Sequence, residues 1–268
     1  MENTKPRALV TGASAGIGAT FARKLSQQGY DLILVARRRD RLDTLAHELG
    51  GAEVLAADLT LDADVKRVED WIAAEPRLEL LVNNAGFGVE GPFFERPAEG
   101  QDQMHRLHIM ATLRLTHAAL RTMVPRRKGA IINVSSVAAF GQSPGSVSYC
   151  ATKAWMNSFT EGIDLELRSA GSPVKVQALC PGFTYSEFHD VAGVDRSRIP
   201  KRLWMSAEDV VQASLDGLAQ SKLFVVPGNM YKTLVFVERV IPRWLHRAGA
   251  IRYARKMKRN LPAPQSHV

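Results

Sequence analysis

An apolar strand, a glycine-rich turn and a helix follow one another within the first 25 residues. The predicted strand is Arg7–Thr11, the turn is residues 12–18 (GASAGIG), and Ala22 and Leu25 lie on the apolar side of the helix. Glycines let the backbone approach a ligand closely, and a helix N-terminus offers unpaired N–H groups and a positive dipole. This order is typical of a phosphate-binding turn, although an ordinary strand-to-helix connection has the same pattern.

The alternation of strands and helices continues along the chain. Long helical regions are predicted over about 101–125 and 149–170, and the further strands are predicted at 31–36, 54–59, 78–82, 131–136, 174–179 and 223–227. Such alternation across short turns indicates an α/β fold, a doubly wound parallel sheet (Rossmann fold) of about seven strands with helices on both faces. The length of 268 residues suits one such domain over residues 1–268.

Polar or small residues follow most of the predicted strands. Asp58 ends the third strand, Asn83-Asn84-Ala85-Gly86 follows the fourth, Ser136 ends the fifth, and Pro181-Gly182 follows the sixth. Because ligands of such sheets bind beyond the carboxyl ends of the strands, we expect these residues to lie near the glycine turn. Asp58 could hydrogen-bond an adenine amino group, or it could cap the helix that begins near Leu61.

The end of the second strand bears on which dinucleotide could bind. An NAD site needs an acid there to hold the ribose 2′-hydroxyl, but Asp31 lies at the wrong end and Arg37 lies at the right one. Arginine suits a 2′-phosphate, and Ser14 in the glycine turn could add a hydrogen bond. We therefore predict NADP(H), although the basic run 37–41 could equally be the start of the next helix.

Tyr149 and Lys153 are four residues apart, so on a helix they lie on one face, one turn from each other. A free tyrosine has a pKa of about 10, and a nearby ammonium lowers that pKa by favouring the phenolate. Tyr149 could then exchange a proton with a substrate oxygen near neutral pH. Ser136, upstream at the end of a predicted strand, could place its hydroxyl beside the phenol. A surface helix with a solvated lysine would show the same Tyr/Lys spacing.

Together these motifs resemble the short-chain dehydrogenase/reductase family in its single-domain form. The matching residues span roughly 7–226 and are Thr11-Gly12-x3-Gly16-x-Gly18, Asp58, Asn83-Asn84-Ala85-Gly86, Ser136, Tyr149-x3-Lys153 and Pro181-Gly182. The resemblance implies hydride transfer between NADP(H) and a carbonyl or alcohol substrate. It implies that Tyr149 gives or takes the proton, that Lys153 lowers the pKa of Tyr149 and binds the nicotinamide ribose, and that Ser136 rather than Ser135 polarises the carbonyl.

The resemblance and the motifs also indicate how the cofactor would be held. Thr184 or Ser186 could hold the nicotinamide carboxamide, and no metal site is expected. The predicted cofactor contacts are Gly12, Ser14, Ala15, Gly16, Ile17, Gly18, Arg37, Asp58, Leu59, Asn83, Ala85, Gly86, Tyr149, Lys153, Pro181, Gly182, Thr184 and Ser186.

One position departs from the pattern of the family. Many members carry an asparagine in the long helix before the fifth strand, where it supports a water that links the lysine to solvent. Here that position is His108. Imidazole can donate and accept hydrogen bonds, so His108 could be a catalytic residue in a relay with altered pH dependence. It could equally be a histidine satisfied by helix packing.

Residues 183–206 correspond to the substrate loop of the family. The segment is rich in aromatic and apolar residues, which fits a hydrophobic ketone, aldehyde or 3-oxoacyl substrate, although these side chains could simply pack the loop down. The residues are Phe183, Tyr185, Phe188, His189, Val191, Pro200 and Trp204.

Residues 229–268 form a basic C-terminal extension. Eight of the 35 lysine and arginine residues follow Glu238 and no acidic residue does, so the formal net charge of +8 belongs to this tail. Apolar residues recur at helical spacing from Leu234 to Ile251, and Pro242 should kink or restart the helix. Such a helix could contact an anionic membrane surface, but docking on the body or on a second subunit is favoured.

The composition limits which partners and which compartment we expect for this protein. The basic residues are confined to one end, which argues against nucleic-acid binding. Cys150 and Cys180 make no disulfide framework, so we expect a cytoplasmic protein, peripheral at a membrane if the tail binds one, and a homodimer or homotetramer. The alternative to an enzyme is an NADPH-binding regulatory or interaction protein with vestigial catalysis, which the intact Ser136, Tyr149 and Lys153 argue against.

Overall fold

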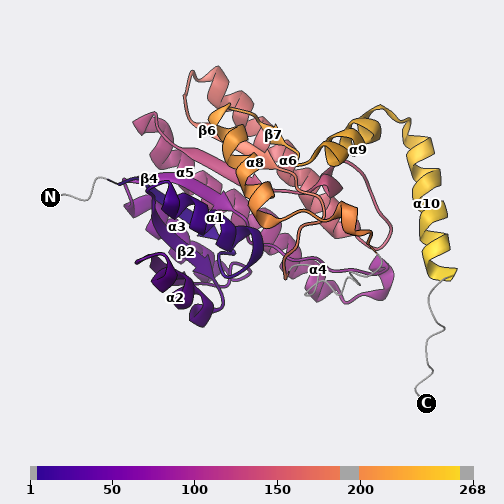
Figure 1. Ribbon diagram of the computed structural model, residues 1–268, viewed down its shortest axis with the longest axis horizontal. Coiled ribbons are helices and arrows are strands. Elements are labelled where there is room, and N and C mark those ends of the chain that lie inside the picture. The colour runs from indigo at the N-terminus through magenta and orange to yellow at the C-terminus, as the bar shows by residue number, and fades with distance from the viewer. Residues whose placement is uncertain (1–4, 188–198, 260–268) are drawn as a thin grey trace, which may run out of the picture.

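Seven parallel strands form one sheet at the centre of the molecule (Figure 1). The computed structural model describes residues 5–187 and 199–259. Across the sheet the strands are β3 (Glu53–Ala56), β2 (Asp31–Ala36), β1 (Arg7–Thr11), β4 (Leu78–Asn83), β5 (Ala130–Val134), β6 (Lys175–Leu179) and β7 (Phe224–Val225). The strand order reverses between β1 and β4, so a crevice is expected at their carboxyl ends. This topology confirms the predicted doubly wound parallel sheet.

Helices cover both faces of the sheet (Figure 1). One face carries α1 (Gly16–Gln27), α2 (Arg39–Glu48) and α8 (Ala207–Ala219). The other carries α3 (Asp62–Ala74), α5 (Thr112–Arg126) and α6 (Val147–Ser169). Strands covered on both faces are buried on both, which explains why β2 continues as an apolar run (LILVA) instead of alternating with polar residues.

The long helical region before β5 is divided by a π-helical segment. A single helix over about 101–125 is predicted, but the structure has α4 (Ala98–His105), a π-helical segment at Arg106–Ala111 and then α5. His108 lies in the π segment and is fully buried. A π turn is wider than an α turn and is often found at functional sites, so this local break marks His108 for attention.

The third strand is shorter than predicted. β3 ends at Ala56, so Asp58 and Leu59 lie in the turn that follows. Asp58 does not cap α3, whose N-cap is Leu61, because its Oδ1 instead accepts hydrogen bonds from the backbone N–H and hydroxyl of Thr60, at 3.0 and 2.8 Å. The capping alternative for Asp58 is therefore wrong.

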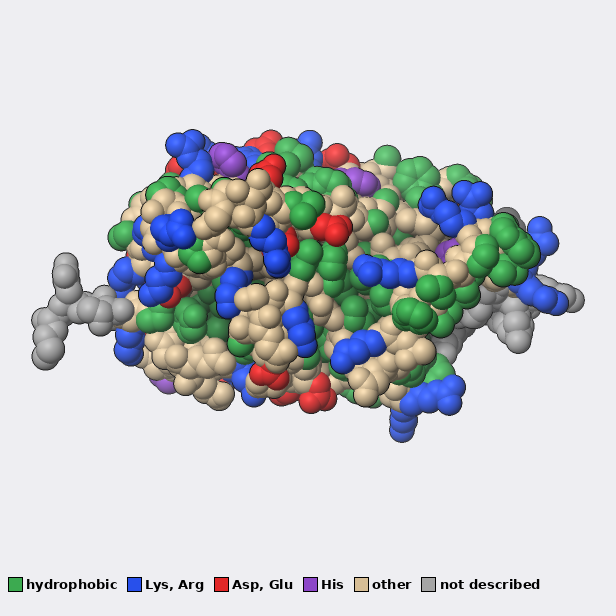
Figure 2. Space-filling model, turned by 90° about the horizontal axis from the view of Figure 1, so that it is seen from above, with side chains coloured by type: hydrophobic (Ala, Val, Ile, Leu, Met, Phe, Trp, Pro, Cys, Tyr) green, Lys and Arg blue, Asp and Glu red, His purple; other side chains and the backbone are tan. Residues whose placement is uncertain are grey.

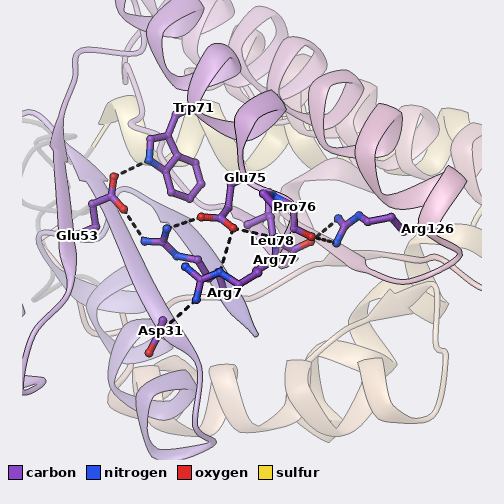
Figure 3. A network of polar contacts seen from close by, with 9 residues as sticks. All are labelled: Arg7, Asp31, Glu53, Trp71, Glu75, Pro76, Arg77, Leu78 and Arg126. Carbon is purple, nitrogen blue, oxygen red and sulfur yellow. Dashed lines mark hydrogen bonds and ion pairs between the residues drawn. The ribbon is translucent and has the colours of Figure 1, made fainter. Parts of the chain in front are cut away.

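A polar network joins the amino-terminal ends of neighbouring strands, at the end of the sheet opposite the glycine turn (Figure 3). Arg7 at the start of β1 donates to Glu53 at the start of β3 and to Glu75 after α3, both at 2.5 Å. Trp71 Nε1 donates to the same Glu53 at 2.5 Å. The side chains of Arg7 and Glu75 are only 13% and 11% exposed, so these charges are shielded from solvent and hold α3 against the sheet.

The C-terminal extension begins with two helices that meet at Pro242, where the kink was predicted. In α9 (Asn229–Val240), Tyr231 and Val235 are buried against the body. Figure 1 shows α10 (Arg243–Arg259) at the far end of the molecule. Its Trp244 is 68% exposed and Ile251 is 49% exposed, so the body does not bury its apolar stripe. Within the described ranges, none of the helices is both long and apolar enough to cross a bilayer.

Candidate active site

The glycine turn leaves the first N–H groups of α1 without side-chain partners. Gly12 and Gly16 have φ angles of +65° and +53°, which strain other residues. A Cβ on Gly18 would lie 2.3 Å from the carbonyl oxygen of Gly12, so a glycine is needed there too. The N-cap of α1 is Ala15, which offers no side-chain cap, and the first turn carries no acid. The turn is therefore open to an anion, as the sequence predicted.

The two asparagines after β4 have different roles. Asn84 braces the glycine turn, because its Nδ2 donates to the carbonyl of Thr11 at 2.9 Å. Asn83 is 4% exposed and donates to Thr116 Oγ1 and Asn133 Oδ1 at 3.0 and 2.9 Å. The side chain of Asn83 therefore joins β4 to β5 and α5 in the core, and the cofactor contact predicted at Asn83 stays a prediction.

Arg38, and not Arg37, lies beside the glycine turn. The Nη2 and Nε atoms of Arg38 donate to Ser14 Oγ at 3.0 and 3.3 Å. Arg37 is 70% exposed, and its Nη1 lies 4.0 Å from Asp58 Oδ2. The arginine beside Ser14 is thus Arg38, and the cofactor contact predicted at Arg37 stays a prediction. Arg38 also pairs with Glu187.

Ser136, Tyr149 and Lys153 come together at the carboxyl end of β5. Ser136 follows the strand, and its hydroxyl lies beside the phenol of Tyr149 on α6 and accepts from the N–H of Ala138 at 3.1 Å. One turn along α6, Lys153 Nζ lies 5.8 Å from the centroid of the Tyr149 ring and donates to the carbonyl of Val134 at 2.7 Å. Ser135 points elsewhere, because its Oγ donates to the carbonyl of Lys153 at 3.1 Å. The choice of Ser136 over Ser135 therefore agrees with the geometry.

Burial controls the protonation of this group more strongly than the lysine does. Desolvation raises the pKa of Tyr149 to about 12, and the Ser136 hydrogen bond opposes this only in part. Desolvation also lowers the pKa of Lys153 to about 8. The expectation that Lys153 lowers the pKa of Tyr149 is therefore not met in the protein alone. At neutral pH Tyr149 holds its proton, which suits proton donation to a substrate oxygen.

Both ring nitrogens of His108 are used within the protein. Nε2 accepts from the backbone N–H of Phe87 at 3.2 Å, so Nδ1 carries the proton and donates to Thr152 Oγ1 at 2.9 Å. Thr152 in turn donates to the carbonyl of Tyr149 at 3.0 Å. Burial first, and the charge of Lys153 second, hold the pKa of His108 well below its usual value. This arrangement favours a neutral, positioning histidine over a proton relay.

His108 also explains the glycine that closes the Asn-Asn-Ala-Gly motif. A Cβ on Gly86 would lie 2.8 Å from His108 Nε2. Gly86 is therefore required by the imidazole, whether or not it also touches a cofactor. Ala85 lies beside it, and its N–H donates to Thr11 Oγ1 at 3.0 Å. The motif thus fixes the mutual position of β1, β4 and the π-helical segment.

One family of known proteins matches most of this chain. The family described as short chain dehydrogenase matches residues 6–195. The chain belongs to the short-chain dehydrogenase/reductase family.

Within the family, the similarity reaches nearly the whole chain. The structure of a short-chain dehydrogenase from Sphingobium yanoikuyae in complex with NADPH is 35% identical, with a TM-score of 0.79, and covers 97% of this chain and 98% of that one. A bulky-bulky ketone specific alcohol dehydrogenase from Comamonas testosteroni is 30% identical, with a TM-score of 0.76 and coverage of 99% and 98%. An uncharacterized oxidoreductase of Staphylococcus epidermidis is 32% identical over 218 residues, 80% of this chain and 90% of its own length.

The residues present fit the nicotinamide dinucleotide that the family uses. The uncapped start of α1 and its three glycines can receive a diphosphate, and Ser14 with Arg38 forms a basic corner beyond β2. Ile17 in the turn is partly exposed, whereas Leu59 is 5% exposed and packs in the core, so the cofactor contact predicted at Leu59 stays a prediction. In the described part of the chain no group of three histidine, cysteine or acidic side chains could hold a metal ion.

The segment after β6 packs over the same end of the sheet. Pro181 accepts from the N–H of Val137 at 3.0 Å. Thr184 is 2% exposed and bonds the carbonyl of Gly182, while Ser186 lies against the glycine turn. Of the predicted carboxamide ligands, Ser186 is therefore the more accessible one.

Sequence reasoning missed Tyr231. Its ring fills the space that a Cβ on Gly182 would take, 2.0 Å from the ring atom Cζ. Its hydroxyl accepts from the N–H of Phe183 at 3.0 Å and donates to the carbonyl of Leu203 at 2.5 Å. Tyr231 thus joins both ends of the predicted substrate loop to α9. No local pattern could have revealed it, because the three segments are far apart in sequence.

Aromatic rings cluster in the described part of the substrate loop. Trp204 stacks on Tyr185 with ring centroids 5.0 Å apart, and the ring centroid of Phe183 lies 5.6 Å from that of Trp204. Phe188, His189 and Val191, also predicted to line the loop, lie outside the described residues. The aromatic character predicted for residues 183–206 is thus seen at both of its described ends.

Proposed function

We propose that this oxidoreductase of the short-chain dehydrogenase/reductase family reduces a hydrophobic ketone with NADPH. The nicotinamide, when bound, supplies the hydride. Tyr149 gives its phenolic proton to the carbonyl oxygen, and Ser136 donates a hydrogen bond that orients and polarises the same oxygen. Lys153, largely protonated at neutral pH, stabilises the phenolate that Tyr149 becomes.

The observation that carries this proposal is that Ser136, Tyr149 and Lys153 lie together at the carboxyl end of β5, at the same end of the sheet as the uncapped glycine turn. A phenol with a pKa of about 12 holds its proton at every physiological pH, so Tyr149 is ready to donate that proton to a carbonyl oxygen.

The preference for NADP(H) is supported by the corner formed by Ser14 and Arg38. An Sphingobium neighbour is described in complex with NADPH, which agrees with this choice. We expect Arg38→Gln to weaken NADPH binding about ten- to a hundredfold and to leave NADH binding nearly unchanged, because a charge-assisted hydrogen bond is worth about 1.5–3 kcal/mol. Arg37→Gln is the matched control. Equal losses for both cofactors, or the larger loss in Arg37→Gln, would contradict the assignment.

The substrate class is supported by the aromatic cluster of Phe183, Tyr185 and Trp204. The Comamonas neighbour is described as specific for ketones with two bulky groups, and its coverage includes the substrate loop and the C-terminal extension. The test is NADPH consumption against bulky ketones, small ketones, aldehydes and 3-oxoacyl thioesters. Faster turnover of bulky ketones is expected, and a preference for 3-oxoacyl thioesters would move the substrate to that class.

We propose that the extension α9–α10 contacts an anionic membrane surface and holds a cytoplasmic protein there. Figure 2 shows hydrophobic side chains gathered at one end of the molecule with lysine and arginine side chains around them. From Arg243 to Arg259 the sequence has seven basic residues and no acidic one. Pairing two such helices across a dimer would bring like charges together, whereas anionic lipid would neutralise them and bury Trp244.

Vesicle sedimentation tests this surface against the alternative of a subunit interface. The full chain should sediment with vesicles containing phosphatidylserine and not with phosphatidylcholine alone. Arg243→Glu/Arg247→Glu should abolish sedimentation and leave the oligomeric state, which we expect to be a homodimer or homotetramer, unchanged. If the parent binds no vesicles and Arg243→Glu/Arg247→Glu dissociates the oligomer, the surface is instead a contact with a second subunit.

A further inference from the structure

One carboxylate joins two parts of the dinucleotide site that are distant in sequence. Glu187, after β6, accepts hydrogen bonds from Arg38 Nη1 at 2.8 Å and from Arg41 Nη1 at 2.5 Å. Arg38 is also the residue that donates to Ser14 in the glycine turn. The carboxylate of Glu187 therefore lies where the donors of the basic corner converge.

The segment that carries Glu187 lies directly against the glycine turn. A Cβ on Gly16 would be 2.7 Å from the Cβ of Ser186, so these two backbones are in close contact. Tyr185, Ser186 and Glu187 line one side of a cavity of about 450 Å³ whose other side includes Ser14 and Gly16. The close contact of Ser186 with the glycine turn, in addition to the two ion pairs, therefore keeps Glu187 beside this cavity.

A 2′-phosphate would need the same donors as Glu187. A phosphate carries up to two negative charges and binds best to arginine and hydroxyl groups, which is what Arg38, Arg41 and Ser14 offer. Both arginines lower the pKa of Glu187, so the carboxyl group is ionised at neutral pH. Two anions on one pair of arginines repel each other, so one must leave when the other binds.

We propose that Glu187 is an internal competitor for the 2′-phosphate of NADP(H), and that it thereby limits the preference of this chain for NADP(H) over NAD(H). The inference rests on the proposed NADP(H) site. NAD(H) has no phosphate at this position, so it can bind while Glu187 keeps its two ion pairs. NADP(H) must displace the carboxylate, so it binds less tightly than it would if Glu187 did not occupy the two arginines.

Another role for Glu187 would have the opposite sign. If the carboxylate served to hold Arg38 and Arg41 in the binding geometry, its removal would weaken NADPH binding. If it fastened residues 185–187 over any bound dinucleotide, its removal would weaken NADPH and NADH alike. Competition alone predicts tighter NADPH binding with unchanged NADH binding.

The experiment is a fluorescence titration of NADPH and NADH into the parent protein, Glu187→Gln and Asp102→Asn. Asp102→Asn is the matched control, because Asp102 makes a comparably exposed ion pair with Arg106 on another part of the surface and neither residue lines the cavity beside the glycine turn. Exposed ion pairs are individually weak, so Glu187→Gln should lower the Kd of NADPH by about three- to tenfold, and less at high salt. The Kd of NADH should stay the same, and Asp102→Asn should change neither Kd by as much.

The outcomes separate this inference from the proposed cofactor. An unchanged or higher Kd of NADPH in Glu187→Gln overturns the competitor role, even where the parent prefers NADPH. A parent that binds both cofactors equally, with a preference for NADPH that emerges in Glu187→Gln, supports the competitor role and refutes the preference proposed for the parent. No preference in either protein refutes both.

Discussion

The buried imidazole of His108 makes a sharp prediction about stability and pH. Its two ring nitrogens bond Phe87 N–H and Thr152 Oγ1, and burial with the nearby Lys153 holds its pKa well below the usual value. His108→Asn replaces the ring by the shorter amide that other family members carry. At about pH 7.5 the substitution should lower the free energy of unfolding by about 1–3 kcal/mol, because at least one buried partner loses its hydrogen bond.

The difference between the two proteins should depend on pH. Because the folded pKa of His108 lies below the unfolded value of about 6.5, the unfolded parent binds one more proton between the two. The parent therefore keeps this contribution to stability above pH 6.5 and loses about 1.4 kcal/mol per pH unit as the pH falls below it. Asparagine does not titrate, so the destabilisation by His108→Asn should shrink steadily as the pH falls below about 6.5.

Urea denaturation of parent and variant at a series of pH values measures this difference, and the titrations common to both proteins cancel. His117→Asn is the control, because His117 lies exposed on α5 and its loss should change stability by less than about 0.5 kcal/mol at pH 7.5. A His108→Asn effect that is constant with pH would refute the low pKa. A pH–rate profile whose shape changes in His108→Asn would restore the proton relay.

Three further substitutions test other parts of the account. Tyr231→Phe keeps the ring over Gly182 but removes the hydroxyl that joins both ends of the substrate loop, so we expect faster hydrogen exchange at Phe183 and a KM raised several-fold with a smaller change in kcat. Glu75→Gln should destabilise the protein by about 1–3 kcal/mol near neutral pH. Because Arg7 and the N–H of Arg77 outweigh desolvation and hold the pKa of Glu75 below its usual value, the parent should lose this advantage as the pH falls through about 4 and below, which acid unfolding curves measure. Ser136→Ala should lower kcat/KM about a hundredfold in NADPH consumption with the cofactor Kd unchanged, and a shift in that Kd instead would contradict its role at the carbonyl.

The parts of the fold that sequence predicts well are those set by local pattern. Buried parallel strands are apolar runs, and β2 is recognisable for that reason. Tyr149 and Lys153 share a helix face by their spacing alone. A run of glycines between a predicted strand and a predicted helix likewise indicates a tight turn at that point. These features need no knowledge of which segments touch.

Sequence is least decisive where one backbone position determines which way a side chain points. Arg37 and Arg38 are neighbours with the same chemistry, and only the path of the chain leaving β2 directs Arg38 to Ser14. Asn83 still belongs to β4, where it pairs in register with Asn133 and points into the core, whereas Asn84 lies past the strand end. The π-helical segment at His108 does not alter the apolar pattern of α4 and α5 enough to be seen in sequence.

The pKa of Tyr149 is also beyond sequence reasoning. The Tyr/Lys spacing suggests that the ammonium dominates, but desolvation does, because α6 packs this segment beneath the loops beyond β5 and β6. A burial effect depends on everything around the group and cannot be read from two residues. The role proposed here for Tyr149 as a proton donor agrees with that direction of the pKa shift.

The most direct test of the central claim is single-turnover oxidation of NADPH by Tyr149→Phe with a bulky ketone, compared with Tyr30→Phe. Tyr30 directly precedes β2, at the amino-terminal ends of the strands and therefore at the end of the sheet opposite the site, so the control removes a phenol without changing the site. Loss of the general acid should slow Tyr149→Phe by about a hundred- to ten-thousandfold with the Kd of NADPH unchanged, while Tyr30→Phe keeps the parent rate. A Tyr149→Phe variant that turns over at the parent rate would contradict the assignment of Tyr149 as the proton donor.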